Sequence, residues 1–556
     1  MTKCKFCGAR LPDGTAVCPS CGKSKMPPSV IPFIPGSKKK AVAGILLATA
    51  IVSVCMGKTA GKTQKTGSGY NEASSVSEGT DAYNEGFAAY DRNDYSNALK
   101  YFLIASKQGN SDAQFFLGKM YTFGFGVEQD FHKAIQYHQL AADQGHVLSQ
   151  NILGIMYENG IGAMTDYQKA VRYYKLAADQ GFADAQYNLG CMYRDGRGVA
   201  TDYQEAWWYF RLAADNGNAE AQCELGYMYT YGIVVNRDFA KASEYLQLSA
   251  SQGYARAQLV LGGMYKTGLG VKQDYAKAME YFQMAAKQEY ARAQTEIGVL
   301  YERGEGVRQD YTKAAEYYKL AANQGEAEAQ CKLGFLYEYG EGVTQDYTKA
   351  EEYYQLSASQ GNAFAQFKLG YMYVNGKGVK QDYAKALGYY QMSASQGNAF
   401  AQFGLGVMYE CGEGVKQDYT KAVEYYQLSA NQGYDAAQIN LGYMYDTGNG
   451  VKQDYAKAME YYLLAANQGN AVAQGNIGHM YKRGQGVKQD YAKAMEYYLL
   501  AANQGFPGAQ YSIGDLYENG YGVGRNYQEA VKWYRKAARN GYTEAQDKLR
   551  NMGESW

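Results

Sequence analysis

The strongest constraint on the fold is a strict 36-residue repeat. A dipeptide that ends in Gln, in most units Ala-Gln, recurs without insertion or deletion along most of the chain. An uninterrupted period of this length is typical of a solenoid, in which similar helical units stack on one another, and not of independent globular domains. The repeated glutamines are Gln114, Gln150, Gln186, Gln222, Gln258, Gln294, Gln330, Gln366, Gln402, Gln438, Gln474, Gln510 and Gln546.

Each repeat reads as a pair of helices. The unit that begins at Ala365 has the pattern A-Q-x-x-L-G-x-M-Y-x-x-G-x-G-V followed by D-Y-x-K-A-x-x-Y-Y-x-x-x-A-x-Q-G. The first half predicts one helix, called helix A below. Paired glycines such as Gly340 and Gly342 end it, because glycine tolerates left-handed turns. An Asp-Tyr step such as Asp346-Tyr347 then starts helix B, with a carboxylate near the helix N-terminus.

The two faces of helix A have different roles. Counting from the repeat Gln at about 100° per residue, Ala at −1, Leu or Ile at +3, Gly at +4 and Tyr at +7 share one side. These positions barely change between repeats, and small residues there let helices approach closely. Positions +1, +5 and +8 project on the opposite side and vary, so this face is free to specialise.

The repeat resembles the Sel-one-like repeat, a relative of the tetratricopeptide repeat. The matching residues run from Ala329 to Ala358, and the resemblance covers residues 112 to about 548. It implies an all-α, right-handed solenoid whose A helices line the concave face, and a role as an adaptor or scaffold. Two positions depart from the pattern, since Val234 replaces a turn glycine and Glu289 replaces a helix-end glycine.

The ends of the solenoid look different from its middle. Residues 81–108 read as a degenerate first helix pair, 109–542 as twelve repeats, and 543–556 as a capping helix and tail. Polar terminal caps are what a stacked array requires.

The first 24 residues predict a zinc ribbon. Four cysteines form the spacing C-x2-C-x10-C-x2-C, namely Cys4, Cys7, Cys18 and Cys21. Two such knuckles supply four thiolates for a tetrahedral structural Zn²⁺, and so small a segment has no core of its own. Two disulfides or free thiols are the alternative. A closed four-cysteine site is not catalytic.

A membrane span is predicted after a Pro- and Lys-rich linker at 25–40. The predicted span covers 41–57. Its uncharged run, from Ala41 to Met56, is slightly shorter than the ~20 residues usual for a spanning helix. An interfacial or buried helix is the alternative. Eight Lys or Arg precede the run, which favours a cytoplasmic zinc ribbon and extracytoplasmic repeats, although Lys58, Lys62 and Lys65 follow it. Residues 58–80 read as a flexible linker.

The charge distribution argues against nucleic acid binding. Residues 1–80 hold 11 Lys or Arg and 3 Asp or Glu, a net charge of +8, so that a neutral chain leaves −8 on the repeats.

No unique catalytic constellation stands out, so the chain is not expected to be an enzyme. The segment from Gly57 to Thr63 has one spacer residue too few for a phosphate-binding loop. Only four histidines occur, and His132, His138 and His146 are spaced so that they do not share one helical face; packing or solvated roles are expected for them. A β-lactam-related hydrolase is the least favoured function, because the repeats lack paired cysteines.

The variable face of helix A is the predicted binding site for protein or peptide partners. Exposed aromatic residues aligned across repeats suit a peptide groove, and burial of the same rings inside the array is the alternative. We therefore expect a membrane-tethered scaffold, with a cell-envelope module for glycan or a small ligand as the alternative function. The aromatic residues at +1 and +5 are Tyr187, Tyr227, Phe335, Phe367, Tyr371, Phe403 and Tyr443.

Overall fold

The computed structural model describes residues 2–3, 10–11 and 76–556. Strand β1 (Thr2–Lys3) pairs antiparallel with β2 (Arg10–Leu11). The four cysteines of the predicted zinc ribbon and the apolar run of the predicted membrane span lie outside the described residues. Across the described part of the chain, no helix is both long and apolar enough to cross a bilayer.

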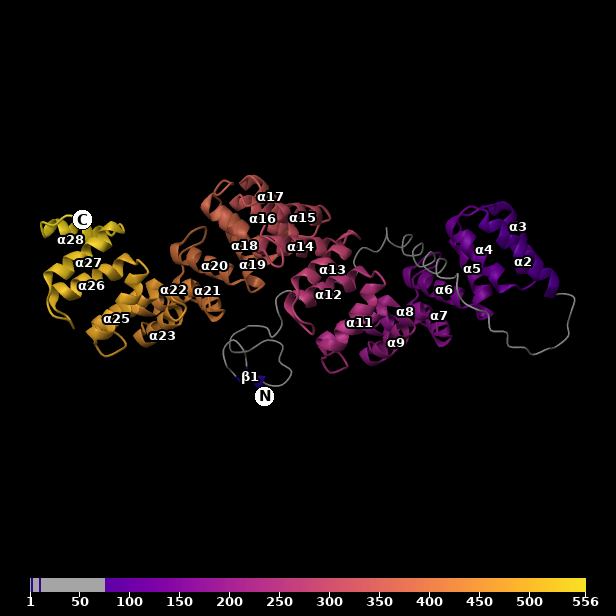
Figure 1. Cartoon of the computed structure of the whole chain (residues 1–556), viewed down its shortest axis with the longest axis horizontal. Helices are drawn as coiled ribbons and strands as arrows, with labels where there is room; N and C mark the ends of the chain where they lie inside the picture. The colour runs from indigo at the N-terminus through magenta and orange to yellow at the C-terminus, as the bar shows by residue number, and fades with distance from the viewer. Residues whose placement is uncertain (1, 4–9, 12–75) are drawn as a thin grey trace. The chain divides into compact units, whose positions relative to one another are not determined.

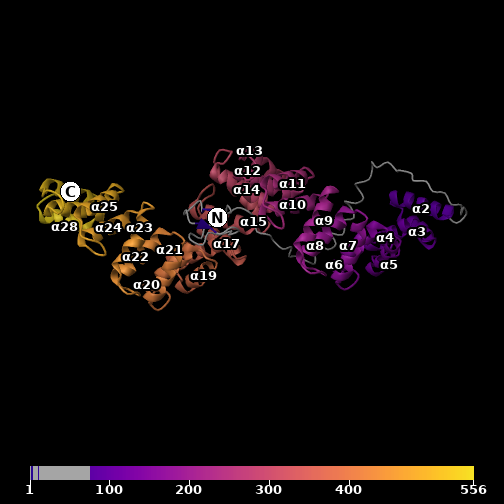
Figure 2. The same cartoon turned by 90° about the horizontal axis from the view of Figure 1, so that it is seen from below.

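From residue 76 onward the described chain is a succession of helices (Figure 1), and the view from below in Figure 2 shows the same succession. Residues 76–293 lie in one compact unit, and residues 294–556 lie in another. The helices are α2 (Val76–Asp91), α3 (Tyr95–Lys107), α4 (Ser111–Phe123), α5 (Phe131–Asp143), α6 (Val147–Asn159), α7 (Tyr167–Asp179), α8 (Ala183–Asp195), α9 (Tyr203–Asp215), α10 (Ala219–Tyr231), α11 (Phe239–Ser251), α12 (Ala255–Thr267), α13 (Tyr275–Ala286), α14 (Ala291–Arg303), α15 (Tyr311–Asn323), α16 (Ala327–Tyr339), α17 (Tyr347–Ser359), α18 (Ala363–Asn375), α19 (Tyr383–Ser395), α20 (Ala399–Cys411), α21 (Tyr419–Asn431), α22 (Asp435–Thr447), α23 (Tyr455–Ala466), α24 (Ala471–Arg483), α25 (Tyr491–Asn503), α26 (Pro507–Asn519), α27 (Tyr527–Arg539) and α28 (Thr543–Asn551).

The predicted helix pairs are confirmed. Even-numbered helices from α4 to α26 are the A helices, and odd-numbered helices from α5 to α27 are the B helices. Helix α18 ends at Gly376, which adopts φ 63°, as the glycine pattern predicts. Helix α17 begins after Asp346, whose carboxylate accepts a hydrogen bond from the backbone N–H of Lys349. That hydrogen bond holds the pKa of Asp346 below its usual value.

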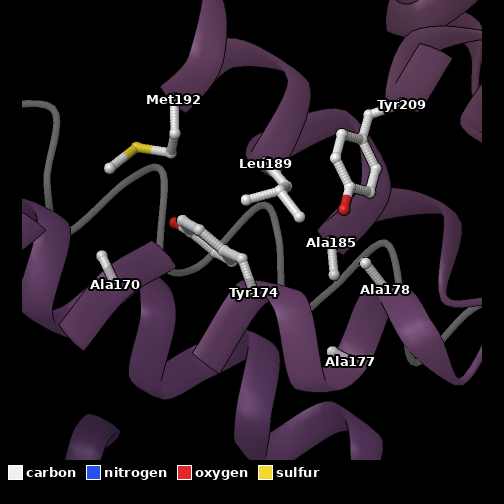
Figure 3. Packing of buried hydrophobic residues seen from close by; sticks show 8 residues of the cluster. All are labelled: Ala170, Tyr174, Ala177, Ala178, Ala185, Leu189, Met192 and Tyr209. Carbon is white, nitrogen blue, oxygen red and sulfur yellow. The ribbon is translucent and has the colours of Figure 1, made fainter. Parts of the chain in front are cut away.

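Helix A and helix B touch through a glycine and an aromatic ring. A methyl group built on Gly334 would lie 2.9 Å from the ring of Tyr354, so only glycine leaves room for this buried tyrosine. Figure 3 shows the equivalent tyrosine five repeats earlier, Tyr174 of α7, which points into the space beside Leu189 and Met192 of α8. The other members of this core are four alanines and Tyr209, and the small alanine side chains let the helices pack closely.

The repeat Gln joins successive repeats. Gln330 is buried, and its side-chain amide donates a hydrogen bond to the carbonyl of Ala322 at the end of α15 (3.3 Å). Its Oε1 accepts one from Gln360 at the end of α17 (2.8 Å). Gln330 therefore ties the C-terminal ends of two successive B helices together, and both atoms of its buried side-chain amide have a hydrogen-bond partner. Gln150, Gln258 and Gln366 make the same pair of contacts.

The two departures from the glycine pattern keep the same backbone. Val234 adopts φ 65° and Glu289 adopts φ 61°, both in the left-handed region where glycine sits in other repeats. Helices α11 and α14 still begin where the repeat pattern places them. The turns are therefore preserved at the expense of local backbone strain.

Candidate protein-interaction face

The variable positions of the A helices form one side-chain surface in each compact unit. We call this surface the helix A face. It is built from positions +1, +5 and +8 of the A helices, and it lies opposite the positions that pack against helix B. In the first unit it includes Tyr187 on α8 and Tyr227 on α10; in the second it includes residues of α16, α18, α20 and α22.

Of the seven predicted aromatic residues, two are exposed and five are partly buried. Tyr371 and Tyr443 are exposed, with 41% and 47% of their surface accessible. The other five are partly buried, which agrees in part with the alternative that the rings pack within the array: Tyr187, Tyr227, Phe335, Phe367 and Phe403.

In the first unit the helix A face is charged. Glu224 is buried between Arg256 (2.5 Å) and Arg194 (3.3 Å). Tyr187 packs against the ring of Phe210, with centroids 5.8 Å apart. Burial raises the pKa of the Tyr187 hydroxyl well above its usual value. Tyr187 is therefore packed against Phe210 and does not present an open ring.

In the second unit a buried lysine organises the aromatic residues. The Lys368 ammonium lies 2.8 Å from the carboxylate of Glu338, and both side chains are buried. It also lies 5.1–5.8 Å from the ring centroids of Phe335, Tyr339 and Tyr371. Ion pairing and cation–π attraction together fix the rings of α16 and α18 around this one cation.

The Glu338 carboxylate has two further partners. It accepts a hydrogen bond from the hydroxyl of Tyr354 (2.8 Å), and Lys377 lies 3.5 Å away. A buried carboxylate with three partners is satisfied, so Glu338 has a supporting role and is not poised for acid–base chemistry.

Further rings continue the surface from α18 to α20. The Phe367 ring lies 5.9 Å from Phe364 and 5.5 Å from Phe400, and Phe400 is 43% exposed. Phe403 and Phe400 both meet Tyr434, at 5.2 and 5.1 Å between centroids. We call the resulting surface the aromatic strip; it consists of Phe335, Tyr339, Phe364, Phe367, Tyr371, Phe400 and Phe403.

Three exposed residues of this strip were not in the sequence prediction. Tyr339 occupies position +9, and Phe364 and Phe400 occupy position −2. These positions project at about 180° and 160°, next to position +5 at about 140°. Their helical angles therefore place them beside the predicted face, whereas their exposure depends on the contacts between repeats. Tyr443 is exposed on α22 at position +5.

The described residues offer no metal site: they contain no group of three or more His, Cys, Asp or Glu side chains able to hold an ion. His138 is fully buried on α5 and His146 caps α6, so both have structural roles. Burial raises the pKa of Cys191 and Cys331 to about 12, which suppresses thiolate formation. Cys411 is exposed.

Comparison with known families identifies the repeat. The model of the Sel1 repeat matches thirteen consecutive segments, which include the degenerate first pair. They are 79–110, 111–146, 147–182, 183–218, 219–254, 255–290, 291–326, 327–362, 363–398, 399–434, 435–470, 471–506 and 507–542. No curated protein matches the chain.

A solved structure agrees with this match. A protective antigen of uropathogenic Escherichia coli with an SLR fold is 33% identical, covers 82% of this chain and 98% of its own, and superposes with a TM-score of 0.66. A Sel1 repeat protein from Oxalobacter formigenes is also 33% identical and covers 56% of this chain and 89% of its own, with a TM-score of 0.43. The chain belongs to the Sel1 repeat family.

Proposed function

We propose that this protein is a scaffold that binds protein partners through the helix A face, with the aromatic strip as the main contact. The observation that carries the proposal is the continuity of the strip over α16, α18 and α20. Lys368 lies beside the exposed rings of Tyr339 and Tyr371, and Phe367 joins Tyr371 to the exposed rings of Phe364 and Phe400. Aromatic rings supply large contact area at a small cost in conformational entropy, and they dominate many interfaces.

The anchoring of the strip supports a preformed binding surface. Lys368 is held by Glu338 and cannot swing freely, so the rings of Tyr339 and Tyr371 are fixed before a partner arrives. Binding to fixed side chains loses less entropy than binding to mobile ones. A partner segment with apolar side chains would therefore find a rigid surface along three successive A helices.

A membrane tether and a structural zinc ion complete this proposal. The Ala41–Met56 run would hold the repeats at a membrane, and Cys4, Cys7, Cys18 and Cys21 would bind Zn²⁺ in a cytoplasmic head. Both are predictions from sequence. Repeats on the extracytoplasmic side would meet partners in the cell envelope.

A pull-down with the full chain tests the proposal. Phe364→Ala combined with Phe400→Ala removes two exposed rings of the strip and should deplete the partners that the unchanged chain enriches. Leu356→Ala combined with Leu428→Ala changes exposed side chains on B helices of the same unit and serves as the matched control. Equal enrichment by the strip variant and the unchanged chain would refute the proposal.

Glycan binding is a second candidate, because exposed Tyr and Phe rings also stack on sugars. Sedimentation with purified cell wall separates the two functions. Retention of the unchanged chain and loss of retention in the Phe364→Ala, Phe400→Ala variant would favour glycan. Absence of retention removes this candidate.

A further inference from the structure

A row of exposed aliphatic side chains runs along the B helices. It occupies position +26 of each repeat, at the centre of the helix B surface that faces away from helix A. We call it the helix B row. In the first compact unit its exposed members are Ile104, Leu140, Leu176, Leu248 and Met284; Leu212 belongs to the row and is partly buried.

Trp208 stands beside this row on α9. It lies one helical turn before Leu212 and is 48% exposed. The preceding and following repeats place charged residues at its position, Arg172 and Glu244. An exposed tryptophan beside a row of aliphatic side chains is unusual on a solvated surface, and tryptophan is among the residues enriched at the centre of protein interfaces.

On α7, and next to Leu212 on α9, the charges flanking the row have opposite signs on its two sides; Glu205 on α9 and Glu244 on α11 are exposed acidic residues on the N-terminal side. On α7, Arg172 and Lys175 precede Leu176, and Asp179 follows it; all three are exposed. On α9, Arg211 precedes Leu212 and Asp215 follows it, and their side chains are 3.9 Å apart and exposed. At 1.5 Å per residue, Arg172 lies about 6 Å before Leu176 along the helix and Asp179 about 4.5 Å after it.

The charges that flank the helix B row are complementary to the same charges in a second copy of the chain. Helices α7 and α9 run in the same direction, because the chain reverses twice between them through short turns. A two-fold axis along the row would place α9 antiparallel to α9 of a second copy. The basic side of each helix would then face the acidic side of its counterpart, with the leucines and Trp208 between them. A two-fold axis across the row would instead bring like charges together.

We propose that the surface around Trp208 on α7, α9 and α11 is a self-association site for a second copy of this chain. Trp208, Leu176 and Leu248 supply the apolar centre, and Arg211 and Asp215 supply reciprocal ion pairs across the two-fold axis. The site is separate from the aromatic strip, so a dimer would present two partner-binding faces.

Sedimentation velocity of the full chain in a nonionic detergent, over a range of concentrations, tests the proposal. The unchanged chain should dimerise reversibly. Trp208→Ala should weaken dimerisation at least tenfold. Arg211→Asp should also weaken it, and the charge-exchanged variant Arg211→Asp, Asp215→Arg should recover most of the loss, because each reversed pair meets its complement in the second copy. Leu320→Ala, at the same row position in the other compact unit, should change nothing.

Circular dichroism should first show equal helicity in all variants, so that any change in dimerisation reflects the surface and not misfolding. A chain that stays monomeric at 100-fold above the concentration used for partner binding, or a dimer that tolerates Trp208→Ala, would overturn the proposal. Failure of the charge-exchanged variant to recover association would overturn the two-fold arrangement on which the proposal depends. A different protein captured at Trp208 by a monomeric chain would also overturn it.

Discussion

The side-chain amide of Gln396 donates a 2.8 Å hydrogen bond to Oε1 of Gln366. The amide of Gln366 in turn donates to the carbonyl of Ala358 at the end of the preceding B helix (3.2 Å). The same pair of contacts recurs along both compact units, with Asn216 and Asn540 in place of the second Gln at two positions. The most regular residue of the sequence is thus a buried connector between repeats.

Replacing Gln366 by Leu should destabilise the second compact unit by about 1–3 kcal/mol, because the amide of Gln396 and the carbonyl of Ala358 each lose a buried partner. Urea unfolding followed by circular dichroism measures the change. Gln355→Leu, on the exposed side of α17, is the control and should stay within about 0.5 kcal/mol. Equal effects of the two substitutions would mean that the Gln366 contacts contribute no stability.

Two glycines within the same repeat should respond oppositely to alanine. A methyl group on Gly370 would overlap the Tyr390 ring, so Gly370→Ala should destabilise by about 1–3 kcal/mol through overpacking. Gly388 lies inside α19 with nothing near its added methyl group, so Gly388→Ala should stabilise by about 0.5–1 kcal/mol. Thermal unfolding of both variants measures the signs. A stabilising effect of Gly370→Ala would contradict the helix A–helix B contact described above.

Replacing Val234 by glycine should stabilise the first compact unit. A β-branched residue at φ 65° is strained by about 1–2 kcal/mol, and part of that gain is offset by the flexibility of glycine when unfolded. Val234→Gly should therefore raise the stability of the first compact unit by up to about 1 kcal/mol in a urea titration. Glu280→Gly, in the middle of α13, should lower it by a similar amount. Destabilisation by Val234→Gly would show that its side chain contributes more than its backbone costs.

His138 should make the first compact unit sensitive to mild acid. Burial lowers the pKa of His138 to about 3, and its ring packs on Gly118 with Nδ1 3.3 Å from Ser149 Oγ. The unfolded chain takes up the proton near pH 6.5, whereas the folded chain does not, so stability falls as pH drops from 6.5 toward 3. Between pH 6.5 and 5 the loss should reach about 2 kcal/mol.

His138→Phe supplies the comparison, because Phe210 and Phe282 occupy the equivalent position against Gly190 and Gly262. Urea unfolding at pH 6.5 and pH 5 should show a much smaller drop for this variant. An identical drop in both proteins would show that the acid sensitivity comes from a group other than His138.

The sequence was sufficient to predict the helix pairs but not the exposed surface. Glycine and Asp-Tyr steps encode the helix boundaries locally, so α17 and α18 begin and end where the pattern places them. Exposure depends on contacts between repeats, which a single helical angle does not contain. Phe367 is partly covered by the Phe400 ring of the next repeat, whereas Tyr443 has no such neighbour among the ring contacts of the described chain and is exposed.

The buried ion pair of the strip could not be predicted either. Lys368 and Glu338 occupy variable positions, and 30 residues separate them in sequence. Their pairing is seen only once α16 and α18 are stacked, because a lysine at position +2 then meets the +8 carboxylate of the preceding repeat.

Site-specific crosslinking in living cells tests the central claim that the aromatic strip binds a partner protein. A photo-reactive phenylalanine analogue replaces Phe400 on the strip in one full-length variant and Leu356 on helix B in another. The strip position should yield a discrete crosslinked protein that disappears when Phe364→Ala is added, and the helix B position should not yield that protein. A Phe400 variant that captures nothing, or the same proteins as the Leu356 variant, would contradict this account.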